Sequence, residues 1–532
     1  MIARYFSTPA SVEGWNDVGF HGNNEIFTPN IDALAYNGVI LNRHYSETLC
    51  TPSRSALLTG KYPIHTGTYH NVLMETHPTG LPLSEKLLPQ YLKSLGYKTH
   101  AVGKWHLGFY KKEYTPVYRG FDSFYGFWNG YQDYYKHNVQ AWFVPFDGYD
   151  MRRNMETDWS ALGKYSTDLF TDEAVNIIME HNRSVPLFLY LAHLAPHSGT
   201  YEDPLQAPEE YIRKFSYLKD PNKRRYTAMV SKLDESVGNV IEALQKNDML
   251  SNCIIVFVSD NGAPTTGLMR NYGTNWPLKG EKSTPWEGGI RTVALMWSKL
   301  LTRKMAISSQ IMHLTDWLPT LYSAAGGNAT ELEGIDGRNM WEVLSGRKNE
   351  YNNVTILHNI DDDNNVGYAA IRHGSYKLVN GTSLLGYLDD WFGRPEERFI
   401  PSYDVAKISR SKTNKILTNS KELREKDVLK LRELVKISCK TKNELNLTLR
   451  NPCQPRIRPC LFNIDNDPCE KNNLYDDDSV KTIQLELEIK LQQFRKSKIK
   501  VTQTTTDKLS NPALYNNTWV NWADIKHSVI IA

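Results

Sequence analysis

Polar side chains that suit an anionic ligand follow three predicted buried strands, at residues 99–102, 187–191 and 254–259. These side chains are Lys104, His106, His197, Asp260 and Asn261. Ligands of an open parallel sheet bind at the carboxyl ends of its strands, so we expect these residues to share one cleft. Lysine and histidine donors beside an Asp-Asn pair of oxygens predict an oxyanion held next to a hard cation.

Each of these residues also has an ordinary structural interpretation. Asp260-Asn261-Gly262 after a strand is commonly a turn. A single histidine at a strand end is more often structural than catalytic, and Lys104 fits an ordinary surface lysine equally well. Only the shared position at strand ends favours a common site.

The elements that would position these residues alternate between short apolar runs and amphipathic stretches over the first 300 residues. This alternation predicts an α/β fold with a large, mostly parallel central sheet flanked by helices. Helices are expected at residues 83–94, 226–245 and 53–59, the last with Pro52 at its opening position.

Two domains are expected, with the sheet in residues 1–350 and a smaller C-terminal α+β domain in residues 351–532. The second domain contains a lysine-rich stretch near 403–450, which resembles an exposed helical insertion, and a solvated charged face is the preferred interpretation. Residues 480–496 show apolar side chains at helical spacing and predict a packing helix.

The charge balance argues against polyanionic or membrane partners. The 62 basic and 59 acidic side chains give a net charge of +3, which provides no reason to expect nucleic acid or an anionic membrane. No run approaches the roughly 18 apolar residues of a membrane span.

Two features indicate passage through an oxidising compartment. Four of the six cysteines cluster at 439, 453, 460 and 469, and four cysteines allow two disulfides in three connectivities. The chain also contains six acceptor motifs for N-glycosylation. Their asparagines are Asn182, Asn328, Asn353, Asn380, Asn446 and Asn516.

A second set of motifs resembles a known family. The run from Cys50 to Gly60 resembles the signature of type I sulfatases, C-x-P-S-R followed by T-G. Gly103-Lys104-Trp105-His106-Leu107-Gly108 resembles the second signature of that family, and Asp260-Asn261-Gly262 is also similar. Over roughly residues 14 to 350 the chain resembles arylsulfatase B and its relatives, which implies an alkaline-phosphatase-like fold.

The resemblance implies a role for each residue. An enzyme of the endoplasmic reticulum, the formylglycine-generating enzyme, would oxidise Cys50 to formylglycine, whose hydrate is the nucleophile. Arg54 and His106 would hold that hydrate, and His197 would protonate the leaving oxygen. The remaining implied contacts are sulfate binding by Lys104 and Lys282, and binding of one calcium ion by Asp260, Asn261 and the formylglycine oxygen at Cys50.

The N-terminus departs from the family pattern. Relatives carry two metal-binding aspartates at the end of their first buried strand, and here Ser11 and Val12 stand at those positions. The preceding residues do not resemble an apolar strand, and residues 1–14 contain no signal peptide. A truncated or replaced N-terminus would explain all three departures, so we expect the first strand to be missing or replaced and the calcium site to lack anionic ligands.

Three functions remain open at this point. The first is a calcium-dependent sulfuric ester hydrolase, lysosomal or secreted, acting on N-acetylgalactosamine 4-sulfate in glycosaminoglycans or on small sulfated metabolites. The second is a catalytically impaired relative that binds sulfated ligands without hydrolysing them. The third, a phosphoryl-transfer enzyme with a zinc pair, is disfavoured because such relatives usually place Ser or Thr where Cys50 stands.

Overall fold

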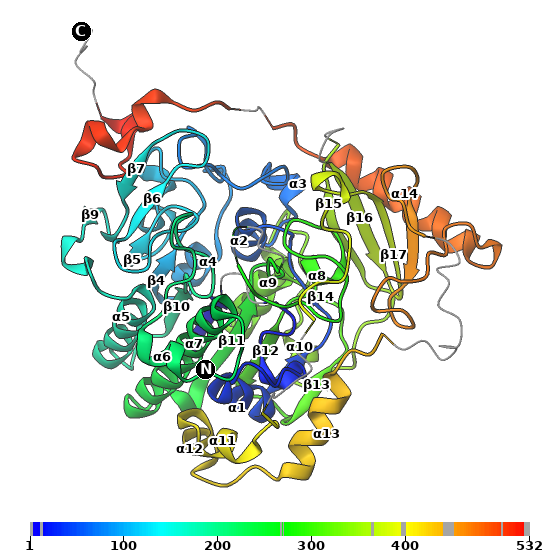
Figure 1. Ribbon diagram of the computed structural model, residues 1–532, viewed down its shortest axis with the longest axis horizontal. Helices are drawn as coiled ribbons and strands as arrows, with labels where there is room; N and C mark the ends of the chain where they lie inside the picture. Colours follow the sequence, from blue (N-terminus) through cyan, green and yellow to red (C-terminus); the bar gives the residue numbers. More distant parts are fainter. Residues whose placement is uncertain are drawn as a thin grey trace.

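A large mixed sheet forms the centre of the protein (Figure 1). The computed structural model describes residues 4–10, 14–265, 269, 271–362, 367–394, 401–439, 452–501 and 504–525, with side chains from residue 14 onward. Within these residues the sheet has ten strands. In spatial order they are β13 (Ala306–Ser308), β2 (Val39–Leu41), β12 (Ala294–Ser298), β11 (Cys253–Ser259), β1 (Arg4–Ala10), β10 (Leu187–Ala192), β4 (Lys98–Lys104), β5 (Ser123–Phe127), β8 (Arg152–Arg153) and β9 (Glu156–Thr157).

The middle of this sheet is parallel. Strands β11, β1, β10, β4 and β5 run in one direction, whereas β12 and β8 pair antiparallel on either side. Every residue of β10 and β11 is buried, as expected for strands covered on both faces. The predicted strands at 99–102, 187–191 and 254–259 are therefore confirmed as β4, β10 and β11.

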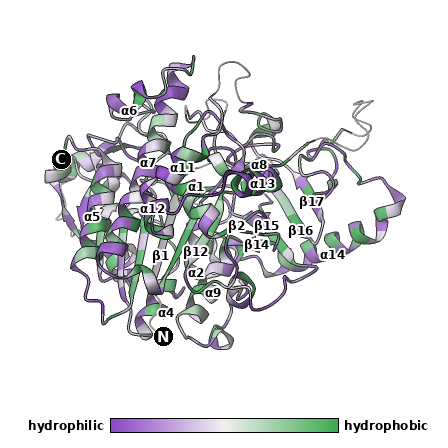
Figure 2. Cartoon of the chain, turned by 90° about the horizontal axis from the view of Figure 1, so that it is seen from below, coloured by the Kyte–Doolittle hydropathy of each residue, from purple (hydrophilic) through white to green (hydrophobic). Residues whose placement is uncertain are grey.

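Helices cover both faces of the sheet, and Figure 2 shows the resulting three layers. The first face carries α1 (Pro29–Asn37), α5 (Ser166–Glu180), α6 (Glu209–Arg213) and α7 (Pro221–Lys246). The opposite face carries α2 (Cys50–Thr59), α3 (Pro63–Thr66), α4 (Leu88–Ser94), α9 (Trp317–Ala324) and α10 (Trp341–Leu344). The expected α/β fold class is confirmed.

The expected alternatives were a missing or a replaced first strand, and a strand does occupy this position, which excludes the missing strand and leaves the replaced one as a prediction. Residues 4–10 form β1, which pairs in parallel with β10 and β11 and ends where Ala10 pairs with Ser259. A ladder is made by backbone N–H and C=O groups, so a segment without an apolar pattern can also occupy this position. Ser11 and Val12 follow β1 directly and lie outside the described residues.

Three helices begin at positions other than those predicted. Helix α2 starts at Cys50, three residues before the predicted Ser53, because proline is well accommodated in the first turn of a helix. Helix α4 starts at Leu88, whereas the sequence predicted a helix from Leu83. Helix α7 is longer than predicted and begins at Pro221 behind Asp220, whose side chain accepts a hydrogen bond from the backbone N–H of Asn222.

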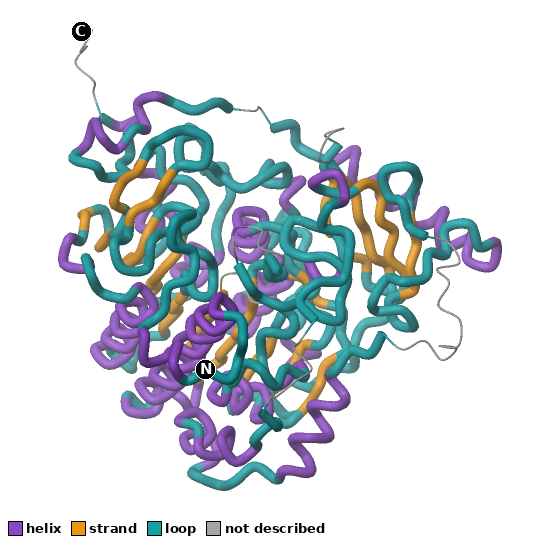
Figure 3. Tube along the Cα trace, in the orientation of Figure 1, coloured by secondary structure: helices purple, strands orange, loops and turns teal. Residues whose placement is uncertain are grey.

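A second, four-stranded antiparallel sheet lies beside the first and appears as a separate group of strands in Figure 3. Its strands are β15 (Thr355–Ile360), β16 (Tyr368–His373), β17 (Tyr376–Gly381) and β18 (Cys460–Asn463). Helix α14 (Lys481–Ser497), predicted at 480–496, packs on this sheet through Leu487 and Leu491. The domain boundary near residue 350 stays a prediction.

The described residues also form two short strand pairs and four further α-helices. The strand pairs are β3 (His44–Tyr45) with β14 (Met312–His313), and β6 (Asn138–Gln140) with β7 (Asp147–Tyr149). The remaining helices are α8 (Glu287–Ile290), α11 (Val405–Arg410), α12 (Lys412–Thr418) and α13 (Glu425–Val435).

The charged insertion is helical where the structure describes it, in α11, α12 and α13. It is not a wholly solvated face, because Val405, Ile408, Val428 and Val435 are buried against the main core. Residues 440–451 of this predicted insertion lie outside the described residues.

Two disulfides join the clustered cysteines, Cys439 to Cys469 and Cys453 to Cys460. This pairing selects one of the three connectivities that the sequence left open. Among the described residues, no helix combines the length and apolar character needed to span a membrane.

Candidate active site

Cys50 is the first residue of α2 and lies at the carboxyl end of the central strands. Leu49 caps the helix, and its carbonyl accepts a hydrogen bond from the N–H of Ser53 at 3.1 Å. Cys50 itself is only 2% exposed. The unpaired backbone N–H groups of a first helical turn carry partial positive charge, so this end of α2 favours an anion.

Lys282, His197 and Asn261 surround the sulfur of Cys50. Lys282 Nζ lies 3.4 Å from Sγ and 3.2 Å from His197 Nε2, and Sγ lies 3.5 Å from Asn261 Oδ1. The Nδ1–H of His197 donates to the carbonyl of Ser198 at 2.8 Å, which leaves Nε2 to accept from Lys282. Residues predicted from three separate loops therefore meet at one sulfur.

Arg54 lies one turn further along α2 and is fixed by three partners. Its guanidinium donates to Asp260 Oδ2 at 2.9 Å, to the carbonyl of Lys104 at 2.9 Å and to the hydroxyl of Tyr190 at 3.3 Å. Arg54 is fully buried, as Asp260 nearly is. The arginine thus connects α2 to the ends of β4, β10 and β11. The sequence prediction did not include Tyr190, whose hydroxyl faces the site from an otherwise apolar strand.

His106 adopts a left-handed backbone conformation, with φ of 59°, directly after β4. Such a conformation is uncommon for histidine and is enriched at functional sites. Its Nε2–H donates to the carbonyl of Leu73 at 3.1 Å, and the backbone carbonyl of His106 accepts a hydrogen bond from Thr51 Oγ1 at 3.0 Å. Gly130 lies against the ring, where an added Cβ would come within 2.5 Å of Cε1. A glycine is therefore required beside this histidine.

Lys104 provides the strongest indication of an anion site in this pocket. Its ammonium group is buried and has no hydrogen-bond partner among the described residues. Burial lowers the pKa of Lys104 to about 8, and the nearby cations Arg54 and Lys282 act in the same direction. A buried cation without a partner is costly, and an anionic ligand would relieve that cost.

The same charges shift the other titratable groups. Burial opposes ionisation of the Cys50 thiol, but the charges of Lys104 and Lys282 outweigh it and hold its pKa well below the usual value. Burial lowers the pKa of His106 to about 4 and that of His197 to about 3, so both rings are neutral at physiological pH. A bound anion would raise these histidine pKa values.

The described residues do not complete a calcium site. Asp260 and Asn261 bring one carboxylate and one amide oxygen to the pocket, and the carboxylate is already paired with Arg54. Calcium takes six to eight oxygen ligands, and no group of three or more acidic, histidine or cysteine side chains within the described residues could hold a metal ion. We therefore derive no step through a metal.

A cavity of about 260 Å³ opens above Cys50, His106, His197 and Lys282. The sequence prediction did not identify its outer wall, which includes Glu75, Tyr131, Trp142 and Phe143. The available signal was the Trp142-Phe143 pair, which stands in an apolar stretch, residues 141–146, that was not assigned to any predicted strand or helix.

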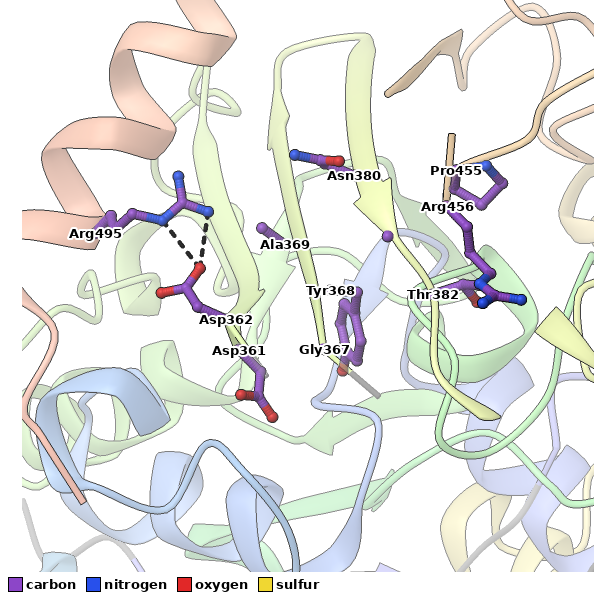
Figure 4. A pocket seen from close by; sticks show the side chains of 11 residues that line it. Asp361, Asp362, Gly367, Tyr368, Ala369, Asn380, Thr382, Pro455, Arg456 and Arg495 are labelled. Carbon is purple, nitrogen blue, oxygen red and sulfur yellow. Dashed lines mark hydrogen bonds and ion pairs between the residues drawn. The ribbon is translucent and has the colours of Figure 1, made fainter. Parts of the chain in front are cut away.

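A larger, polar cavity of about 330 Å³ lies in the second sheet, between β15, β16, β17 and α14 (Figure 4). Its acidic side chains already have partners. Asp362 pairs with Arg495 at 2.9 Å, and Asp361 pairs with His70 at 2.8 Å. Among the described residues that line this cavity there is no nucleophile of the kind found at Cys50, so the smaller pocket is the candidate active site.

Comparison with known proteins agrees with this geometry. Residues 12–327 match the family described as Sulfatase, and the chain belongs to that family. Arylsulfatase J of Mus musculus is 44% identical over 375 residues, which cover 70% of this chain and 60% of that protein. N-acetylgalactosamine-6-sulfatase of Homo sapiens is 32% identical over 355 residues, which cover 62% of this chain and 63% of that protein. The matched part thus spans less than two thirds of either relative.

Solved structures agree with the fold over nearly the whole chain. The crystal structure of Ps i-CgsB in complex with k-i-k-neocarrahexaose superimposes with a TM-score of 0.73 at 26% identity, covering 97% of each chain. The PsFucS1 sulfatase from Pseudoalteromonas sp. has a TM-score of 0.65 at 20% identity, covering 95% of this chain and 92% of that one. The expected membership in the type I sulfatase family is confirmed.

Proposed function

We propose that this chain hydrolyses sulfuric esters at Cys50, after oxidation of that cysteine to formylglycine. The observation that carries the proposal is the unpartnered ammonium of Lys104 beside Cys50, which itself lines a pocket together with Lys282, His106 and His197. Preorganised cations and donors of this kind stabilise the charge of a transferring sulfuryl group.

The surrounding residues have distinct roles in this proposal. A hydrated aldehyde at position 50 supplies two hydroxyls, one to attack sulfur and one whose deprotonation later releases sulfate. Lys104 and Lys282 bind the sulfate oxygens, and Arg54 holds the helix end and Asp260 in place. His106 is positioned to accept a proton from the attacking hydroxyl, since its Nδ1 has no hydrogen-bond partner among the described residues.

The leaving oxygen would take its proton from the Lys282–His197 pair. The two side chains are 3.2 Å apart and share one hydrogen bond. The free His197 ring is neutral at physiological pH. An anionic ester bound beside it would raise the pKa of His197 and so make its charged form accessible. The pair would then donate a proton from His197 Nε2, and Lys282 would supply its replacement.

The natural substrate in this proposal is a sulfated glycan or a small sulfate ester. The relative named N-acetylgalactosamine-6-sulfatase supports a sulfated amino sugar, and the complex of Ps i-CgsB supports a sulfated oligosaccharide. We retain N-acetylgalactosamine 4-sulfate in glycosaminoglycans and small sulfated metabolites as the two substrate classes to test.

Maturation in the endoplasmic reticulum, followed by a lysosomal or secreted location, belongs to the same proposal. The formylglycine-generating enzyme would act there on the segment around Cys50. Two disulfides support an oxidising compartment. The asparagines of the five glycosylation motifs that the structure describes are all exposed, and Asn446 lies outside the described residues. These features would allow a glycoprotein.

The direct test is turnover of 4-nitrophenyl sulfate by protein from a secretory host, with mass spectrometry of the peptide that contains Cys50. We expect the aldehyde in that peptide and complete loss of turnover in Cys50→Ala. Cys253→Ala is the matched control, because Cys253 is also buried and belongs to neither disulfide. Turnover that survives in Cys50→Ala would remove the proposed nucleophile.

The alternative function is a sulfatase-like binding protein without hydrolysis. It is favoured by the small number of carboxylates near Asp260 and by Ser11 and Val12 at the family's aspartate positions. Under this alternative the protein binds sulfate esters but releases no inorganic sulfate. Calorimetric titration with calcium also separates the two functions, because the binding protein should not bind calcium. The Ser11→Asp/Val12→Asp variant should gain calcium binding if these positions lie at the site.

A further inference from the structure

The cavity above Cys50 has two chemically different parts. Its floor contains Cys50, His106, His197 and Lys282, and the proposed function assigns these residues to the sulfate. Its outer part is largely apolar and aromatic and also contains Glu75. The apolar and aromatic side chains there are Val72, Met74, Tyr131, Trp142, Phe143 and Leu384. The proposed chemistry does not use them.

The aromatic side chains of the outer part form a continuous wall that reaches the floor. Tyr131 lies nearly parallel to the ring of His197, with centroids 6.4 Å apart and planes 19° apart. Trp142 meets Tyr131 edge-on at 6.3 Å and 80°. The wall thus extends outward from the residue that would protonate the leaving oxygen, which is where a leaving group must lie.

The rim of this wall is exposed although it is apolar. Trp142 is 55% exposed and Phe143 is 74% exposed. Both lie between β6 and β7, and β7 is anchored to the C-terminal segment by hydrogen bonds of Tyr149 with Asn517 and Trp519. Aromatic surface presented on an anchored hairpin at the mouth of a cavity provides a preformed contact for an apolar ring face.

The charges of the outer part are unfavourable for a polyanion. Glu75 is 5% exposed and lines the cavity beside the backbone of Trp142, and burial raises the pKa of Glu75 to about 7, so its carboxyl is charged above that pH. Among the described residues that line the cavity, Lys282 is the one lysine or arginine, and it lies at the sulfur of Cys50. A second anionic group on the ligand would therefore meet a carboxyl group and no cation in the outer part.

We propose that the outer part is a leaving-group subsite for an uncharged ring with an apolar face, and that Trp142, Phe143 and Glu75 select it over an anionic glycan. The inference rests on the proposed function, because the sulfate of the same ligand must occupy the floor. Between the two substrate classes named above, it favours small neutral sulfate esters over the polyanionic chains of glycosaminoglycans.

Binding to a Cys50→Ala protein tests the subsite without chemistry. Calorimetric titrations would compare 4-methylumbelliferyl sulfate, inorganic sulfate, and a disaccharide that joins N-acetylgalactosamine 4-sulfate to a uronate. We expect the fluorogenic ester to bind most tightly. Trp142→Ala and Phe143→Ala should each weaken its binding by roughly tenfold, because each removes a large apolar contact. Both should leave the binding of inorganic sulfate unchanged.

Two further variants sharpen the test. Glu75→Gln keeps the shape and an acceptor for the backbone of Trp142. Above pH 7, where the Glu75 carboxyl is charged, this variant should strengthen binding of the uronate disaccharide several-fold. Tyr387→Ala removes an aromatic side chain that is 81% exposed and lies outside the cavity lining, and should change nothing.

Each outcome separates the subsite from the chemistry. Unchanged binding of the fluorogenic ester in both aromatic variants, or tighter binding of the uronate disaccharide than of the ester by the Cys50→Ala protein, would overturn the subsite. Failure of inorganic sulfate to bind would instead overturn the proposed function of the floor.

Discussion

Two clusters of buried charge in this protein differ in how completely their charges are paired. One is the Cys50 pocket, formed by Lys104, His106, His197 and Lys282 around Cys50. The other is the interface cluster, where Lys377, Arg372 and Glu470 of the second sheet region meet Glu287, Arg291 and Tyr45. Burial is similar in both, because Lys104 is 1% exposed and Lys377 is fully buried.

Charges in the interface cluster balance one another. Lys377 Nζ lies 3.0 Å from Glu287 Oε1 and 2.7 Å from Glu470 Oε1. The hydroxyl of Tyr45 donates to Glu287 Oε2 at 2.7 Å, and Arg372 pairs with Asp465 at 3.2 Å. No bound ligand is needed to stabilise these groups.

The Cys50 pocket leaves positive charge in excess. Lys104 has no hydrogen-bond partner among the described residues, and Lys282 interacts with a sulfur and a neutral imidazole. Buried charges that are fully paired contribute to structure, whereas an unmatched buried cation indicates a site for an anion. The comparison predicts that mutations in the two clusters will affect different properties of the protein.

Lys377→Met should have the largest effect on stability. It leaves Glu287 and Glu470 buried together without their cation, and breaking a buried ion pair typically costs about 3–5 kcal/mol. Denaturant unfolding monitored by fluorescence would measure the loss. The variant Lys377→Met/Glu287→Gln/Glu470→Gln removes all three charges and should recover much of the stability. A Lys377→Met protein as stable as the parent would show that the interface cluster is not a balanced network.

Lys104→Met should greatly reduce turnover without reducing the stability of the fold. Turnover of 4-nitrophenyl sulfate should fall by about 10²–10³, the usual effect of removing one donor that stabilises a transition state. The free energy of unfolding should stay the same or rise, because the mutation removes an unpartnered buried cation. Steady-state kinetics and denaturant unfolding on one preparation would check both results. A large loss of stability would place Lys104 with the structural charges.

Sequence reasoning located the floor of the Cys50 pocket well because strand topology determines it. His197 and Asp260 each follow a strand whose burial on both faces is visible as an apolar run, and His106 follows the neighbouring strand β4. Parallel strands must end at the same edge, so their loops converge. The family signature then identified Cys50 and Arg54, which no periodicity could have assigned.

The same reasoning failed where position depends on backbone pairing or on distant segments. β1 lacks an apolar pattern, yet its backbone completes the sheet between β10 and β11. In the interface cluster Lys377 contacts Glu287, which is 90 residues away along the chain, and Glu470, which is 93 residues away. Glu75 and Trp142 likewise meet only in the folded protein. Local sequence contains no signal for such contacts.

Glu470→Gln should alter the pH dependence of stability. Burial and the charge of Glu287 raise the pKa of Glu470 to about 7, although Lys377 opposes this shift. The folded state therefore holds this proton more tightly than the unfolded state, so the contribution to stability is complete below about pH 4.5 and is lost as pH rises through 7. The loss for this group is on the order of 1–3 kcal/mol. Unfolding from pH 5 to 8 should show a smaller decline in Glu470→Gln, and equal declines would contradict the raised pKa.

Asp362→Asn should have the smallest effect on stability, because this charge lies near the surface, outside both buried clusters. Asp362 pairs with Arg495 and Lys498, but its side chain is 40% exposed, and exposed ion pairs contribute about 0–1 kcal/mol. We expect a small change in unfolding free energy and unchanged turnover of 4-nitrophenyl sulfate. These results would show that the exposed ion pairs of Asp362 contribute little to the stability of the fold and do not position any residue at Cys50. A tenfold fall in turnover would instead connect the polar cavity of the second sheet to the Cys50 pocket, and two separate clusters would no longer describe the molecule.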